Sequence, residues 1–149
     1  MRNRPRPEHA LILALASPAL LGASLPPGEV SATVTELRSS KGHVVACLTA
    51  RPAAFPDCEH DPQALALTVP AVEGAELDFG HVPDGRYAIA LFHDENGNGR
   101  LDKRLMMPRE GYGFSQNAPV RFGPPSFARA SFKVEGGEAH QSIRMRYIF

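Results

Sequence analysis

The sequence lacks an excess of charge of either sign, which argues against a nucleic-acid-binding protein. It contains 16 Lys and Arg residues against 16 Asp and Glu residues. Residues 1–24 hold three of the basic residues and one of the acidic residues, so the remainder carries a formal charge near −2. Proteins that bind nucleic acids present a concentrated basic face. We therefore expect no nucleic acid among the partners of this chain.

Long apolar runs are also missing beyond the N-terminus. Three arginines in the first six residues precede an apolar run over residues 10–21, and small residues up to Ser24 follow. This order is typical of a secretory signal peptide, and about 12 apolar residues are too few to span a hydrocarbon core that needs about 20. We predict a signal peptide over residues 1–24 and one domain over residues 25–149 without a transmembrane segment. This domain is expected to be periplasmic or secreted, with an envelope or extracellular partner.

Cysteine is scarce, with Cys47 and Cys58 as the only two. In an exported chain, an even and closely spaced pair predicts a disulfide that closes a short loop. A metal or catalytic site that also uses His60 is the alternative, but the spacing matches no zinc motif. We therefore predict a disulfide between Cys47 and Cys58.

No long helical period is present, and short runs instead alternate apolar and polar residues with period two. Val30, Ala32 and Val34, for example, alternate with Ser and Thr, which is the pattern of a half-buried strand. Residues 64–67 alone could also form a helical turn, and the last two runs suggest a hairpin around Gly136 and Gly137. The whole pattern predicts an all-β, antiparallel β-sandwich, transthyretin- or immunoglobulin-like, with one long ordered loop. Its seven or so strands are expected at residues 30–35, 41–50, 64–69, 75–79, 87–92, 127–134 and 142–149.

The long loop starts with an oxygen-rich stretch, HDENGNGRLD, directly after the apolar run YAIALF. Asp94, Asn96, Asn98 and the glycine that follows reproduce the first half of a calcium loop. The twelfth position is Leu105 instead of a bidentate Glu, and no helices flank the stretch, so a helical EF-hand is excluded. A non-helical Ca²⁺ site and a compact turn without metal both remain open, because Asn and Asp also cap their own backbone in turns. The candidate ligands are Asp94, Asn96, Asn98, the Arg100 carbonyl, Asp102 and Glu110.

The same loop contains residues suited to acid–base chemistry or to ligand binding. His93 lies beside Asp94, and with Glu110 the three form a set of groups that general acid–base catalysis uses. Gly113 to Ser115 begin like a nucleophile elbow, but the strand–turn–helix context is missing. The leading hypothesis is an envelope-associated binding or accessory module with its working surface on residues 93–118, and a small periplasmic enzyme is the alternative. The residues expected on that surface are His93, Tyr112, Phe114 and Ser115.

These motifs together carry a resemblance to a known family. The ordered segments LDFGHVPDGRYAIALFHDENGNGRLD, MPREGYGFSQNA and FGPPSFARASFKV resemble an uncharacterised bacterial exported family, domain of unknown function 2141. The resemblance covers residues 30–148, and it implies an exported, single-domain β protein without supplying an activity, a cofactor or a catalytic residue. The residues that match its most specific pattern are Gly85, Tyr87, Ala88, His93, Asp94, Asn96, Asn98, Gly99, Asp102, Pro108, Glu110, Gly111, Gly113, Phe114 and Ser115.

Overall fold

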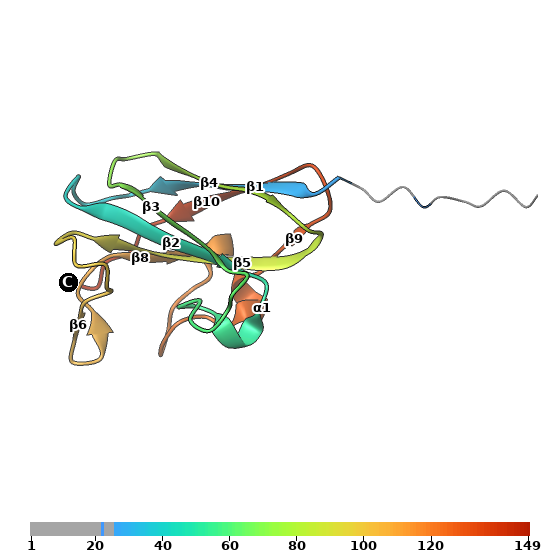
Figure 1. The fold of residues 1–149 in the computed structure, drawn as a ribbon. Helices are drawn as coiled ribbons and strands as arrows, with labels where there is room; N and C mark the ends of the chain where they lie inside the picture. The colour runs from blue at the N-terminus through green and yellow to red at the C-terminus, as the bar shows by residue number, and fades with distance from the viewer. Residues whose placement is uncertain (1–21, 23–25) are drawn as a thin grey trace, which may run out of the picture.

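Two β-sheets packed face to face form the body of the protein (Figure 1). The structure is a computed structural model that describes residue 22 and residues 26–149, so the predicted signal peptide lies outside the described residues apart from Gly22. One sheet has the order β10-β1-β4, and the other has the order β3-β2-β5-β8 with β9 paired to β5. The strands are β1 (Gly28–Thr35), β2 (His43–Thr49), β3 (Leu65–Pro70), β4 (Ala75–Val82), β5 (Gly85–Asp94), β6 (Lys103–Arg104), β7 (Met107–Pro108), β8 (Tyr112–Phe114), β9 (Phe132–Val134) and β10 (Glu138–Arg144).

The all-β sandwich predicted from the sequence is confirmed, and the apolar face of each strand forms its core. In β1 the alternate residues Val30, Ala32 and Val34 are fully buried, as period-two alternation requires of a sheet with one face covered. They pack in one cluster with side chains of the opposite sheet such as Val44 and Ile89. The helical turn considered for residues 64–67 does not form, because every residue from Leu65 to Pro70 pairs with β2.

Strand β5 is covered on both faces, as its doubly apolar sequence predicts. Ala88 and Ala90 point away from the main core into a second cluster, where they meet Tyr112 and Phe114 of β8. This cluster also takes in residues near the 3₁₀ helices η1 (Pro52–Ala54) and η2 (Ser115–Asn117) and the helix α1 (Phe127–Ala130). Among the residues described, no helix is long and apolar enough to cross a membrane.

The predicted disulfide is present. Cys47 in β2 is bonded to Cys58, and their Cα atoms lie 6.4 Å apart. The bridge therefore fastens the Pro-rich segment after β2 onto the outer face of the sheet, beside the second cluster. The alternative of a site built from these cysteines and His60 is excluded by this bond.

The terminal hairpin predicted around Gly136 and Gly137 is wrong. Strand β10 pairs in parallel with β1, while β9 pairs with β5 in the other sheet. The two glycines have positive φ values of 60° and 62°, and the Gly137 carbonyl accepts a hydrogen bond from the Glu29 backbone N–H. The connection therefore crosses from one sheet to the other instead of turning back within one. The predicted strands at residues 127–134 and 142–149 are also displaced, since α1 occupies Phe127–Ala130 and β10 ends at Arg144.

Candidate functional site

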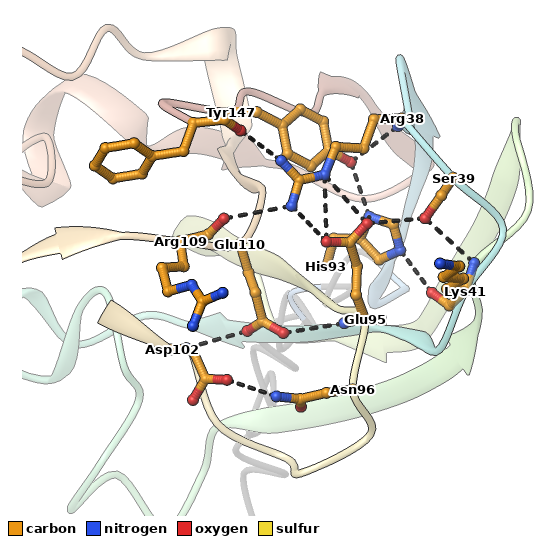
Figure 2. A network of polar contacts seen from close by, with 11 residues as sticks. Arg38, Ser39, Lys41, His93, Glu95, Asn96, Asp102, Arg109, Glu110 and Tyr147 are labelled. Carbon is orange, nitrogen blue, oxygen red and sulfur yellow. Dashed lines mark hydrogen bonds and ion pairs between the residues drawn. The ribbon is translucent and has the colours of Figure 1, made fainter. Parts of the chain in front are cut away.

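The long loop after β5 and the connection between β1 and β2 line an open polar pocket (Figure 2). The pocket has a volume of about 320 Å³. Its walls come from three places that are far apart in the sequence: residues 38–41, the start of the loop at residues 95–102, and its return at residues 109–110. The lining side chains are Arg38, Lys41, Glu95, Asn96, Asp102, Arg109 and Glu110.

The oxygen-rich stretch at the start of the loop is held by its own hydrogen bonds. The Asp94 carboxylate is buried, and its two oxygens accept the backbone N–H groups of Asn98 at 3.1 Å and Gly99 at 2.8 Å. The side-chain amides of Asn96 and Asn98 donate to the two oxygens of Asp102, at 2.6 Å and 2.9 Å. The Asn98 side-chain oxygen in turn accepts the backbone N–H of Arg100. This is the geometry of side chains that cap a compact turn.

Glu110 closes the loop from its far end. Its buried carboxylate accepts the backbone N–H of Glu95 on one oxygen and that of Asp102 on the other, both at 3.1 Å. Glu110 thus reaches back to the turn as the sequence suggested, but it binds backbone amides there. The part of the chain that the structure describes contains no group of three or more His, Cys, Asp or Glu side chains that could hold one metal ion. The calcium site stays a prediction, and the geometry favours the alternative of a self-capped turn.

His93 is fully buried, and both of its ring nitrogens are engaged. Its Nε2 lies 2.7 Å from the Lys41 carbonyl, which can only accept, so Nε2 carries a hydrogen. Its Nδ1 lies 2.8 Å from the Tyr147 hydroxyl, and that hydroxyl also accepts the Arg38 backbone N–H. Burial raises the pKa of Tyr147, so its hydroxyl stays protonated. His93 therefore ties three chain segments together, and no observation here favours the acid–base hypothesis for His93, Asp94 and Glu110.

Three residues expected on the working surface are buried instead. Tyr112 and Phe114 of β8 pack on the alanines of β5, and Ser115 is fully enclosed. The Ser115 hydroxyl accepts the Ile89 backbone N–H and donates to the Ala130 carbonyl. The prediction that these side chains and His93 form a surface is wrong, because all four are buried. The exposed part of the loop consists of polar and basic residues and the apolar residues Leu105 to Met107.

No sequence motif marks Arg38, whose side chain has several partners at the pocket. Its guanidinium binds both carboxylate oxygens of Glu95, lies 4.5 Å from the centroid of the Tyr147 ring and donates to the Phe149 main-chain oxygen at 2.6 Å. Hydrogen bonds from Arg38, with a further one from Ser39, lower the pKa of Glu95 to about 2. Arg38 follows β1 with no motif around it, so only its three-dimensional neighbours reveal its role.

The charges that line the pocket are satisfied unequally. All three carboxylates have partners within the protein: Glu95 pairs with Arg38, Asp102 binds two Asn amides and Glu110 binds two backbone amides. Within residues 26–149, neither the Lys41 ammonium nor the Arg109 guanidinium forms a hydrogen bond or an ion pair, although both side chains line the pocket. The charged groups of the pocket that lack a hydrogen-bond partner are therefore the two cations, although three cations and three carboxylates balance in the lining as a whole.

The chain belongs to a bacterial family described as an uncharacterized protein conserved in bacteria, domain of unknown function 2141, whose model matches residues 32–142. This match confirms the resemblance seen in the sequence. It spans the sandwich and the whole of the loop that forms the pocket. Neither the curated proteins nor the solved structures include a match to the chain.

Proposed function

We propose that this member of the family is an exported, envelope-associated binding or accessory module that holds a small anionic group in the pocket of loop 93–118. The observation that supports this most is the unequal satisfaction of charge in the pocket. Lys41 and Arg109 stand without partners beside carboxylates that are already bound. A carboxylate or phosphate group would complete the hydrogen bonds of both cations, and charge-assisted bonds of this kind are among the stronger polar contacts.

The pocket is also built to keep its shape before a ligand arrives. Glu110 fixes both ends of the turn at residues 95–102, and the buried His93 holds the Lys41 main chain by its carbonyl. A site that is ordered in advance loses less conformational entropy on binding, so two cations can suffice for measurable affinity.

Two features outside the pocket support an exported location. The Cys47–Cys58 disulfide is of a kind that persists in oxidising compartments, and the first 24 residues have the order of a signal peptide. We infer from these two features that the module works in the periplasm or outside the cell.

Calorimetric titration of the protein with succinate and with inorganic phosphate tests the binding proposal. We expect saturable binding of at least one of them in the millimolar range or tighter, weakened by added salt. Lys41→Gln and Arg109→Gln should each weaken it about tenfold, the equivalent of about 1.4 kcal/mol for one charge-assisted hydrogen bond.

Lys133→Gln is the matched control. Lys133 lies on β9, outside the pocket lining, and its exposed ammonium is paired with Glu135. This variant should bind like the unaltered protein. Absence of heat with both anions, or equal weakening by all three variants, would contradict the proposal.

A further inference from the structure

A second feature of the loop, separate from the pocket lining, is the small hairpin of β6 and β7. Its two-residue turn consists of Leu105 and Met106, which are 86% and 92% exposed, and Met107 follows at 43%. Isolated apolar residues are common on surfaces, but three consecutive ones at the tip of a projecting hairpin form an exposed apolar group. Nothing in the described part of the chain covers it.

The backbone at this tip is unfavourable for the residues that occupy it. Leu105 and Met106 have φ values of 50° and 70°, in the left-handed region. Two-residue hairpin turns of this hand are normally made by Asn-Gly or Asp-Gly, because these residues tolerate positive φ. Leucine and methionine at these positions improve neither the turn nor the core of the sandwich. Neither the turn nor the core therefore accounts for the apolar character of the tip.

Basic residues surround the base of the tip. Arg100, Lys103 and Arg104 are all exposed, and none of them takes part in an ion pair among the described residues. The one acidic residue in residues 100–107 is Asp102, whose oxygens are bound by Asn96 and Asn98. The hairpin thus presents an apolar end with a positively charged base.

A second apolar tip projects in the same direction. Phe122 is fully exposed in the connection between η2 and α1, with the exposed cations Arg121 and Arg129 close to it in the sequence. In Figure 1 this connection and the β6–β7 hairpin both extend below the sheet of β2, β5 and β8, on the side away from β1, β4 and β10.

We propose that the β6–β7 hairpin docks the protein on an anionic lipid surface, with Phe122 as a second contact. In this arrangement Leu105, Met106 and Met107 enter the boundary between headgroups and acyl chains, as apolar side chains of interfacial proteins do. The cations at the base lie at the level of the headgroups, where anionic lipids attract Lys and Arg. The charge of the hairpin base favours this surface over a neutral one.

Flotation with lipid vesicles tests this proposal on the protein recovered from the producing cell, with its N-terminus defined by mass spectrometry. Vesicles that contain phosphatidylglycerol are expected to bind at least about tenfold more protein than vesicles of phosphatidylcholine alone, and salt should reduce the difference. The double variant Leu105→Asn with Met106→Gly should lower binding at least about tenfold. This variant installs the preferred turn residues, so its loss of binding cannot be ascribed to misfolding.

Val72→Ser is the matched control, because it removes an exposed apolar side chain from the connection between β3 and β4. This variant should bind vesicles as the unaltered protein does. The proposal is overturned if neither vesicle binds the protein at low salt, or if the tip variant and the control lose binding equally. Self-association that the tip variant abolishes, without vesicle binding, would assign the tip to a second copy and likewise overturn it.

Discussion

Arg38 and Glu95 form an ion pair that joins the connection after β1 to the first residue after β5. The Arg38 Nε lies 3.1 Å and 3.2 Å from the two carboxylate oxygens of Glu95, and Nη2 donates to one of them as well. The pair forms one wall of the pocket and holds together two segments that the sequence separates by more than 50 residues (Figure 2). Its geometry has consequences for the stability of the fold at low pH.

Glu95→Gln should reduce the free energy of unfolding at neutral pH and make little difference in strong acid. The pKa of Glu95 falls from 4.5 to about 2 on folding, so its contribution is complete above pH 4.5 and is lost as the pH falls through 2. We expect a loss of about 1–2 kcal/mol at pH 7, discounted from the full pKa shift because Arg38 is partly exposed. Urea denaturation between pH 7 and pH 2 measures the difference.

Glu36→Gln is the control for this experiment, since Glu36 pairs with Arg144 while both side chains are more than half exposed. It should produce a much smaller loss. A Glu95 variant whose deficit stays constant from pH 7 to pH 2 would be inconsistent with the depressed pKa.

His93→Phe should destabilise the protein by about 2–4 kcal/mol, because it leaves the Lys41 carbonyl and the Tyr147 hydroxyl without their partner in a buried place. Tyr147→Phe removes the bond to His93 and also the bond that the hydroxyl accepts from the Arg38 backbone N–H, so it should cost about 1–3 kcal/mol. Chemical denaturation measures both variants, with exposed His43→Gln as a control that stays within about 0.5 kcal/mol of the unaltered protein. A His93 variant as stable as the control would refute the structural role assigned here.

Replacement of both Cys47 and Cys58 by alanine should lower the free energy of unfolding by about 3 kcal/mol in the chain-entropy model for a loop of this length. Reduction of the unaltered protein by dithiothreitol should have a similar effect. Mass spectrometry of protein from an oxidising compartment checks the premise, and two free thiols would contradict it.

Asp94→Asn should cost about 1–2 kcal/mol, because one of its two N–H-accepting oxygens becomes an amide donor. For a self-capped turn, the thermal midpoint of the unaltered protein should be the same in EDTA and in millimolar Ca²⁺. Asp78→Asn is a suitable control, since exposed Asp78 caps Gly80 through one oxygen alone. A midpoint that Ca²⁺ raises in the unaltered protein and not in the Asp94 variant would establish the calcium interpretation instead.

Strands such as β1 could be predicted from the sequence because their alternation reflects burial of one face. Strand β5 could be predicted because it is apolar on both faces. The final pairing could not be predicted in the same way. A hairpin around Gly136 and Gly137 is the local solution, whereas the parallel pairing of β10 with β1 joins residues more than 100 positions apart. Local residue patterns carry no information about such a register.

The part of the site that has a local residue pattern was also predictable from the sequence. The turn from Asp94 to Asp102 has a local signature, and the sequence indicated both its capping role and the return of Glu110. The contributions of Arg38 and Lys41 depend on how the β1–β2 connection lies against the loop, which no motif records. The bond of Tyr147 to His93 likewise joins segments 54 residues apart, which no local pattern indicates.

The central claim, that the pocket binds a small anion, is tested most directly by NMR. Titration of ¹⁵N-labelled protein with succinate and, separately, with inorganic phosphate should, for at least one of the two anions, shift backbone amide signals of residues 38–42 and 109–111 together, with a common saturation curve. Arg109→Gln should weaken that curve about tenfold while the spectrum elsewhere stays the same. Signals that do not move, or that move mainly on β9 and α1 away from the pocket, would contradict the account.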